Sequence, residues 1–321
     1  MKKYIYLDWN VIQYMKRNIV VAGKFDAEQF NLFVNSYKNK FSFPISEGHL
    51  RDLSATYNEE TKKYVEEDLS FIRKMSNGLM LGVSHDESEI RPIPADIQDQ
   101  FRIILNEVHE DSTIKVTGGG SHRIDMSKLS KNSLFRPHLE KNGGIMNDDV
   151  MEKTLLDMLD NIDNPDSYKQ LRSEVSILQD VINDNDVLLS KDSPYFKKIE
   201  AVFKVGQIND LAYLRENFDK IFDSFLAIDG RKRSNLSTGK LIETAYMLLD
   251  FTPLFRDRIN KKNRPSNMHR DIKNFYFASH AKFYVTEDDA TYKKSKFVAK
   301  FLGLKVKVVK MDELRHRLTC L

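Results

Sequence analysis

Four aspartates lie near the expected carboxyl ends of strands: Asp8, Asp52, Asp271 and Asp288. Asp8 ends a strand, Asp52 follows a second strand by nearly two helical turns, Asp271 opens a helix and Asp288 follows a third strand. In a parallel α/β sheet, functional groups gather beyond the carboxyl ends of the strands. Carboxylates that converge there repel one another and raise each other's pKa unless a cation lies between them. Because the ligands would all be oxygen atoms, Mg²⁺ or Mn²⁺ is favoured over zinc. We therefore expect a metal site at which these four aspartates are the ligands and the catalytic groups.

Each aspartate also has an ordinary structural explanation. Asp8 can cap a helix, and Asp288 can be a turn residue. Asp52 and Asp271 can be surface residues of helices. The shared placement of all four near strand ends is what favours a metal site over four separate structural roles.

The elements that would bring the aspartates together come from the two ends of the chain. In the N-terminal part, residues 4–7 and 41–46 have strand patterns, and each segment is followed by a helical pattern. In the C-terminal part, strand patterns at 282–286 and 304–309 alternate with helical ones. Helices are expected at 10–16, 47–57, 238–249, 269–280 and 293–302. Strands that alternate with helices imply an α/β fold with a mainly parallel sheet.

The middle of the chain has a different texture. Residues 57–235 carry long amphipathic patterns and few strand signals, which predict a mostly helical insertion. Within it, residues 115–144 are polar, with glycines near both ends, and are expected to form a long loop. The predicted organisation is an α/β domain made of residues 1–56 and 236–321, interrupted by this insertion.

Charge is distributed unevenly, although the net charge is only +3. Residues 256–310 contain 15 Lys and Arg against 5 Asp and Glu, whereas residues 148–186 contain 11 acids against 3 bases. Solvated helix faces can produce such blocks, but a basic segment around two of the four aspartates also fits a polyanionic substrate. The candidate phosphate-binding cations are Arg270, Lys273, Lys293, Lys294 and Lys296.

Composition excludes several classes of protein. The single cysteine, Cys320, cannot build a disulfide framework or a cysteine-based zinc site. Every apolar run is far shorter than the roughly 20 residues of a membrane helix, so no membrane association is expected. The N-terminal residues do not have the apolar stretch of a secretory signal. A cytoplasmic location is therefore expected.

The residues around the four aspartates resemble the motifs of PIN-domain ribonucleases, the family to which VapC-like toxins belong. Residues 7–11, in which Asn10 follows Asp8 at a spacing of two, are similar to the opening motif of that family. Residues 46–52 are similar to the second motif, although the family usually has Glu where this chain has Asp52. Asp271 resembles the third motif, and residues 285–288 resemble the fourth.

This resemblance implies a PIN-like fold and a Mg²⁺- or Mn²⁺-dependent endoribonuclease that hydrolyses phosphodiester bonds of RNA. In that mechanism the carboxylates hold one or two metal ions, which activate water and stabilise charge on the phosphate. Asn10, Ser46 and Thr286 would orient water, metal or aspartates, and Asp289 is a substitute for Asp288. His49 shares a predicted helix face with Asp52 and is a candidate for contact with phosphate.

Two other functions stay open from the residues. A PIN-like module could bind RNA or protein without cleaving RNA, since Asp52 departs from the family pattern. A haloacid-dehalogenase-like phosphatase could use Asp8, but it usually needs a second aspartate where Asn10 stands. By analogy with the family, a bacterial toxin or a phage-defence effector is expected, with the helical insertion binding a protein partner or a second copy of the chain.

Overall fold

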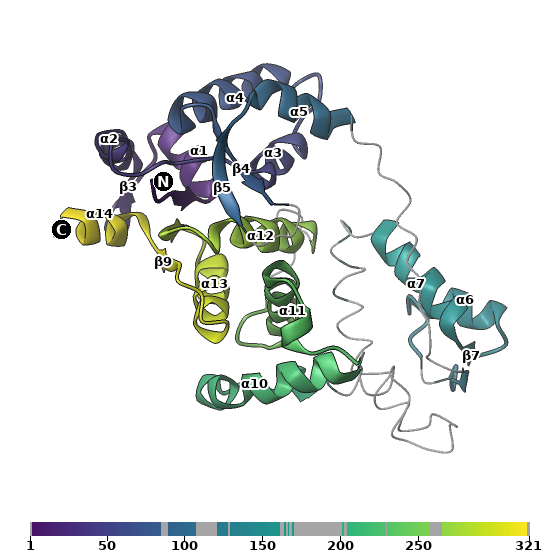
Figure 1. Cartoon of the computed structure of the whole chain (residues 1–321). Helices are drawn as coiled ribbons and strands as arrows, with labels where there is room; N and C mark the ends of the chain where they lie inside the picture. Colours follow the sequence, from purple (N-terminus) through teal and green to yellow (C-terminus); the bar gives the residue numbers. More distant parts are fainter. Residues whose placement is uncertain are drawn as a thin grey trace. The chain divides into compact units, whose positions relative to one another are not determined.

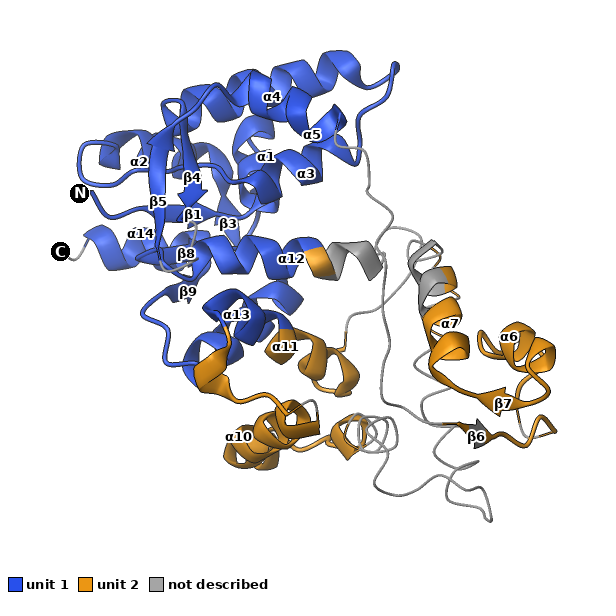
Figure 2. Ribbon diagram, turned by 45° about the vertical axis from the view of Figure 1, so that its right-hand side comes forward, with its two compact units in different colours: residues 1–108, 237–243, 270–321 blue, residues 109–236, 244–269 orange. Residues whose placement is uncertain are grey.

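The computed structural model describes residues 2–84, 89–106, 121–127, 129–160, 164, 166, 169, 201, 204–228, 230–256 and 265–319. These residues form a mixed α/β protein in which two compact units can be distinguished (Figures 1 and 2). Unit 1 consists of Met1–Val108, Ser237–Glu243 and Arg270–Leu321, and unit 2 consists of His109–Leu236 and Thr244–His269. The division into a nuclease domain and an insertion at residues 57 and 235 stays a prediction.

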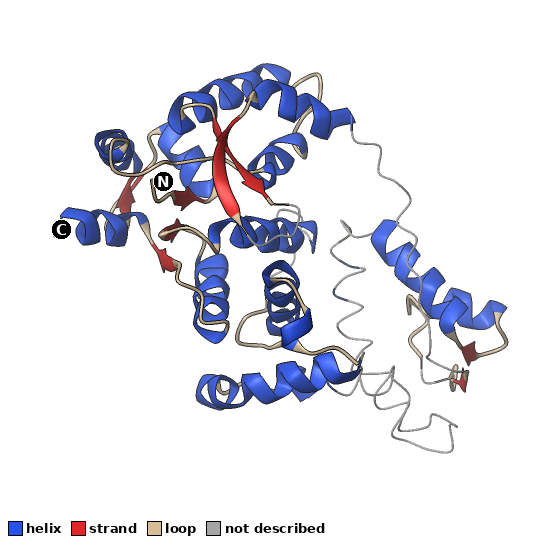
Figure 3. Cartoon of the chain, in the orientation of Figure 1, coloured by secondary structure: helices blue, strands red, loops and turns tan. Residues whose placement is uncertain are grey.

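Helices and short strands follow one another along unit 1 (Figure 3). Its strands are β1 (Ile5–Leu7), β2 (Val20–Val21), β3 (Phe25–Asp26), β4 (Leu79–Val83), β5 (Ile90–Pro94), β8 (Phe283–Val285) and β9 (Lys307–Val309). Its helices are α1 (Trp9–Arg17), α2 (Ala27–Tyr37), α3 (Glu47–Ser54), α4 (Lys62–Ser76), α5 (Ile97–Asn106), α13 (Asp289–Phe301) and α14 (Met311–Thr319). Two further helices, α11 (Thr238–Phe251) and α12 (Pro265–Ala278), contribute residues to both units.

A three-stranded parallel sheet with the order β1-β8-β9 joins the two ends of the chain. Leu7 lies beside Val285 in the register, and Val285 lies beside Val309. Every residue of β1 and β8 is buried, as expected for parallel strands that other elements cover on both faces. The α/β class and the parallel pairing expected from sequence are confirmed, and the last residues of these strands meet at one edge.

The strand expected at residues 41–46 is reduced to two isolated parallel bridges. Ser42 bridges to Tyr4, and Ile45 bridges to Met80, so this segment lies between β1 and β4. The Ile45 N–H donates to the Leu79 carbonyl at 3.1 Å, and the Leu81 N–H donates to the Ile45 carbonyl at 2.7 Å. Pro44 has no N–H to donate, which accounts for the end of the pairing with β1 after Ser42.

The antiparallel hairpin of β4 and β5 was not expected from the sequence. Pro92 pairs in register with Leu81, and Pro94 pairs with Leu79. Two prolines in five residues argue against a strand, but proline is tolerated where its nitrogen faces no neighbouring strand. Among the described residues β5 pairs only with β4, so it is such an edge strand.

Two helices of the C-terminal part begin earlier than expected. α12 begins at Pro265, a residue suited to the first turn of a helix, so Asp271 lies inside the helix instead of opening it. α13 begins at Asp289, because the Asp288 side chain caps it by accepting from the Thr291 N–H at 2.7 Å. Gly303 follows α13 with φ of +64°, as expected of the residue that ends this helix.

A large hydrophobic cluster of unit 1 takes its buried residues from both strands and helices. Helix α1 buries one face, formed by Val11, Ile12 and Met15 at helical spacing. Its last turn carries the basic residues Lys16 and Arg17. Each apolar side chain of this size contributes about 1.5–3 kcal/mol on burial. The sheet edge that carries Asp8 is therefore fixed by packing on several sides.

Unit 2 contains β6 (His122–Arg123), α6 (Arg136–Lys141), β7 (Ile145–Met146), α7 (Asp148–Asp160), α10 (Leu211–Ile228) and the 3-10 helix η1 (Arg233–Asn235). α6 falls in the stretch predicted to be a loop, so that prediction is wrong for these residues; Pro137 in the first turn starts the helix. Residues 173–182, where the sequence has another helical pattern, lie outside the described residues. In the part of the chain that the structure describes, no helix is long and apolar enough to cross a membrane.

Candidate active site

The four predicted aspartates all belong to unit 1. Asp8 follows β1 directly, and Asp288 follows β8 by three residues. Asp52 lies on α3, and Asp271 lies on α12. Since β1 and β8 are parallel neighbours, Asp8 and Asp288 lie at the same edge of the sheet.

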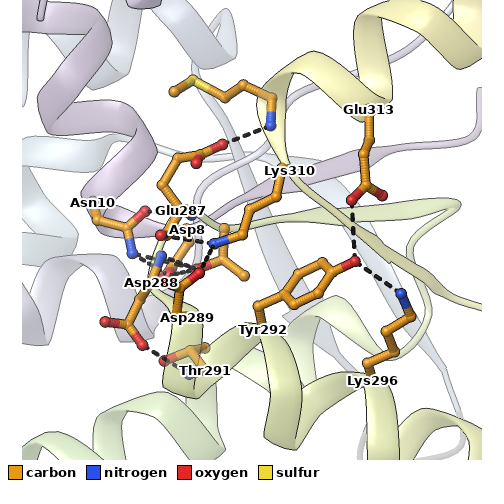
Figure 4. Close-up of polar contacts among 12 residues, drawn as sticks. Asp8, Asn10, Glu287, Asp288, Asp289, Thr291, Tyr292, Lys296, Lys310 and Glu313 are labelled. Carbon is orange, nitrogen blue, oxygen red and sulfur yellow. Dashed lines mark hydrogen bonds and ion pairs between the residues drawn. The ribbon is translucent and has the colours of Figure 1, made fainter. Parts of the chain in front are cut away.

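Asp8 is buried and held by three donors. Its Oδ1 accepts from the Trp9 N–H at 2.9 Å, which caps α1. Its Oδ2 accepts from Asn10 Nδ2 at 2.7 Å and from the Thr286 hydroxyl at 2.6 Å (Figure 4). Asn10 and Thr286 thus contact the carboxylate that they were predicted to orient.

The loop after β8 is tied to the start of α1 by the same two residues. The Glu287 N–H donates to Asn10 Oδ1 at 3.2 Å, and the Asp288 N–H donates to Thr286 Oγ1 at 3.2 Å. Asn10 also donates to Thr286 Oγ1 at 3.3 Å. These bonds fix Asp288 relative to Asp8 through backbone groups.

Electrostatics shows that three of the aspartates lie near one another. The pKa of Asp8 is raised to about 7, first by burial and then by the negative charges of Asp52 and Asp288, against the hydrogen bonds from Thr286 and Trp9 that lower it. Burial also raises the pKa of Asp52 to about 6. Carboxylates with raised pKa values at a strand edge hold negative charge that a cation would stabilise.

Asp271 joins this group through a threonine that sequence reasoning missed. The Thr291 hydroxyl donates to Asp271 Oδ2 at 3.2 Å, while the Thr291 N–H donates to the cap residue Asp288. The three side chains come from α12, α13 and the turn before α13. Threonine in the first turn of a helix is common, so the sequence carries no signal for this bridge.

Asp52 has both carboxylate oxygens engaged by residues of α12. Arg270 Nε lies 2.9 Å from Oδ1, and Asn274 Nδ2 donates to Oδ2 at 3.1 Å. Arg270 and Asn274 are four residues apart and therefore lie on one face of the helix. Asn274 was not predicted as a site residue, although its spacing from Arg270 is a helical signal that could have found it.

A buried polar chain leads from Asn274 to Ser46. The Tyr6 hydroxyl donates to Asn274 Oδ1 at 2.8 Å and lies 2.6 Å from Ser46 Oγ. Burial raises the pKa of Tyr6 well above its ordinary value, so the phenol keeps its proton. Because that one proton is donated to Asn274, the Ser46 hydroxyl is the donor to Tyr6. Ser46 is fully buried and is linked to Asp52 through two other side chains, those of Tyr6 and Asn274.

Gly48 in the first turn of α3 leaves room for this chain. A Cβ at this position would meet Asn274 Oδ1 at 2.1 Å and Ser46 Oγ at 3.2 Å. The first distance is far below any van der Waals contact. A residue with a side chain cannot stand here unless Asn274 moves.

His49 does not face the site, which corrects its prediction as a phosphate contact. The ring is fully buried: Nδ1 accepts from the Ser46 N–H at 3.0 Å, and Nε2 donates to the Leu7 carbonyl at 2.8 Å. Burial lowers the pKa of His49 to about 4, so the ring is neutral near pH 7. It stacks on Tyr6 and serves as the acceptor of a capping box at the start of α3.

Asp289 is not equivalent to Asp288. Lys310 Nζ lies 2.9 Å from Asp289 Oδ1 and donates to the Glu287 carbonyl at 2.8 Å (Figure 4). This ammonium lowers the pKa of Asp289. Because the Asp289 carboxylate faces Lys310, the geometry does not favour the prediction that Asp289 could take the place of Asp288 in the site.

The five predicted phosphate-binding cations have different surroundings. Arg270 pairs with Asp52, and Lys273 pairs with Glu47 of α3. Lys293 and Lys296 are exposed on α13, and Lys296 donates to the Tyr292 hydroxyl at 2.8 Å. Lys294 is only 2% exposed, so its prediction as a phosphate contact is wrong. Its position on the inner face of the amphipathic α13 is the reason.

Among the described residues, no group of three or more His, Cys, Asp and Glu side chains could hold a metal ion. Mg²⁺ often uses only one or two protein carboxylates and keeps several water molecules. Asp8 and Asp288 offer two carboxylates whose charges influence one another. The donor chemistry thus fits Mg²⁺ or Mn²⁺ at these two residues, without a cage built by the protein alone.

Comparison of this chain with protein-family models, with curated proteins and with solved structures finds no match. The class that fold and site define is therefore a mixed α/β protein with an acidic site at the edge of a parallel sheet.

Proposed function

We propose that this protein is a Mg²⁺- or Mn²⁺-dependent nuclease that hydrolyses phosphodiester bonds of RNA. The observation that carries the proposal is the buried Asp8 carboxylate, whose pKa of about 7 reflects its burial and the nearby charges of Asp52 and Asp288. An active site of this kind has an excess of negative charge that a divalent cation would balance. The motifs that resemble those of PIN-domain ribonucleases favour RNA as the substrate.

The residues around Asp8 would have distinct roles in this reaction. Asp8 and Asp288 would hold the ion, which when bound supplies an activated water and positive charge for the phosphate. Asn10 and Thr286 donate to Asp8 and so orient its carboxylate. Thr291 links Asp271 to Asp288 and would keep Asp288, the more exposed of the two, in place.

The exposed lysines of α13 support a polyanionic substrate. Lys293 and Lys296 follow the Asp288 cap by five and eight residues, about 8 and 12 Å along α13, so a phosphate bound to them lies near the acidic site. A nucleic acid bound in this way would bring one of its phosphodiester bonds to the aspartates.

We expect the purified protein to cleave labelled total RNA in the presence of Mn²⁺ and to stop when EDTA is added. Metal-free protein should regain activity when Mn²⁺ or Mg²⁺ is returned, because the ion supplies the activated water. A labelled single-stranded DNA of matched length is the comparison for sugar specificity. Cleavage that persists in EDTA would contradict the proposal.

We also expect replacement of Lys293 and Lys296 by Gln to weaken RNA binding and its dependence on salt. Each phosphate contact that is lost should lower the slope of log affinity against log salt by about 0.7 for single strands. Filter binding over a range of KCl measures this slope. The matched control replaces Lys62 and Lys63, two exposed lysines of α4, by Gln. Equal effects in the two double variants would show that only net charge matters.

One observation favours a second candidate function, a PIN-like module that binds RNA without cleaving it. Both oxygens of Asp52 are engaged by Arg270 and Asn274, which leaves one acid fewer for metal. Binding that survives replacement of Asp8, with no cleavage by the wild type, would identify this function. The phosphatase alternative is disfavoured, because Asn10 stands where that family needs an acid and donates to Asp8.

A further inference from the structure

Asp52 of α3 forms an ion pair with Arg270 of α12. Arg270 Nε lies 2.9 Å from Asp52 Oδ1, and Asn274 occupies Oδ2 at 3.1 Å. The Tyr6 hydroxyl donates to the Oδ1 atom of Asn274 and so fixes the orientation of that amide. Asp52 is thus oriented toward nitrogen donors of α12 on both of its oxygens.

This ion pair is partly removed from water. The Asp52 side chain is 13% exposed, and the Arg270 side chain is 28% exposed. Ion pairs in such places are screened less than pairs on the surface, and loss of one partner leaves a desolvated charge behind. Arg270 is therefore not readily exchanged for another cation at Asp52.

A divalent ion and a guanidinium on the same carboxylate would repel each other. If Asp52 were a metal ligand, Arg270 would have to leave it or tolerate that repulsion. Asp8 and Asp288 have donors of a different kind, namely hydroxyl, amide and backbone N–H groups, which carry no full charge. The positive charge of a metal ion is needed at these two aspartates, whereas Asp52 already has a cation.

We propose that Asp52 holds Arg270 in place of a second metal ion, so that the acidic site binds one divalent ion at Asp8 and Asp288. Arg270 then supplies the second positive charge of the site. A guanidinium suits this role, because it stays charged at any working pH and donates in a fixed plane to phosphate oxygens. This inference rests on the proposed function, and it specifies how many ions the site takes and what replaces the other.

The test is Mn²⁺ binding to the full chain, measured by electron paramagnetic resonance of free Mn²⁺ and by calorimetry, without RNA. The wild type should bind one ion. The double variant Asp52→Asn/Arg270→Gln replaces the pair by neutral side chains at unchanged net charge, and should bind one ion with Kd within about threefold of the wild type. Arg270→Gln alone should lower the Kd about tenfold or add a second ion, because a positive charge is removed and Asp52 is released.

Arg233→Gln is the matched control, because Arg233 is 29% exposed and its Nε pairs with Asp223 at 2.6 Å in unit 2. It should leave Mn²⁺ binding unchanged. Two ions bound to the wild type, or loss of the ion in the double variant, would overturn the inference while the proposed function stands. Should the double variant fail to show a native circular-dichroism spectrum, the wild-type stoichiometry decides. No Mn²⁺ bound by the wild type, or full binding in Asp8→Asn, would instead overturn the proposed function and this inference with it.

Discussion

Replacement of Asp8 by Asn should reduce the rate of RNA cleavage by about a thousandfold or more, a loss of about 4 kcal/mol of transition-state stabilisation. The amide carries no negative charge, so the site loses the more enclosed of its two proposed metal ligands. The same substitution should raise the stability of the metal-free protein at pH 8. The two effects have opposite signs because the buried charge that the proposed reaction needs opposes folding.

The direction of the stability effect follows from the pKa of Asp8. The folded-state value of about 7 lies above the ordinary 3.8, so the folded protein binds the proton more tightly than the unfolded chain does. The stability of the wild type is therefore highest below pH 3.8 with respect to this group, and it falls as the pH rises to 7. The full difference corresponds to about 4 kcal/mol at most.

The amide has a penalty of its own. Trp9 N–H, Asn10 Nδ2 and the Thr286 hydroxyl all face the Asp8 oxygens, and the amide nitrogen must oppose at least one of these donors. One such mismatch costs about 1–3 kcal/mol. We therefore expect Asp8→Asn to be more stable than the wild type by about 1–3 kcal/mol at pH 8, and less stable at pH 4.

Urea unfolding at pH 4, 6 and 8 in EDTA measures this change of sign, and the RNA assay with Mn²⁺ measures cleavage. Asp288→Asn should also abolish cleavage. Asp289→Asn, the neighbouring acid that pairs with Lys310, is the control that should retain it. Cleavage by Asp8→Asn, or a stability difference that does not vary with pH, would contradict the role of Asp8 as a buried metal ligand.

The placement of Asp8 and Asp288 could be predicted because it depends on local rules. An apolar run followed by an acid indicates a strand end, and parallel strands carry their ends to one edge. The role of Asn10 was implied by the resemblance of residues 7–11 to a family motif, and its spacing of two from Asp8 keeps it in the first turn of α1. These residues lie within a few positions of the strands β1 and β8.

The remainder of the site depends on how α3 and α12 pack together, which no local pattern contains. Arg270 and Asp52 are far apart in sequence, so their pairing is visible only once the helices meet. His49 is buried against Tyr6 and Leu7 of β1, although its spacing from Asp52 placed both on one helix face. Spacing predicts which side chains share a face, but not which element covers that face.

Gly48→Ala should destabilise the protein, although alanine is the better helix former by about 1 kcal/mol. The new Cβ would lie 2.1 Å from Asn274 Oδ1, so Asn274 must move from its bonds with Tyr6 and Asp52. Overpacking and the loss of buried hydrogen bonds each cost about 1–3 kcal/mol. These costs exceed the gain in helix propensity, and we expect a net loss of about 2–4 kcal/mol in the free energy of unfolding.

Asn274→Ala is the background that identifies the cause. With the Asn274 side chain truncated, the atom at 2.1 Å is gone and only the looser contact with Ser46 Oγ at 3.2 Å remains, so Gly48→Ala should cost far less, about 1 kcal/mol or less. The resulting double-mutant cycle, measured by urea unfolding, should give a coupling energy of about 2 kcal/mol or more. Equal losses from Gly48→Ala in both backgrounds would show that Asn274 is not what excludes a side chain there. A coupling of the expected size would show that glycine at position 48 leaves the room that Asn274 needs to donate to Asp52.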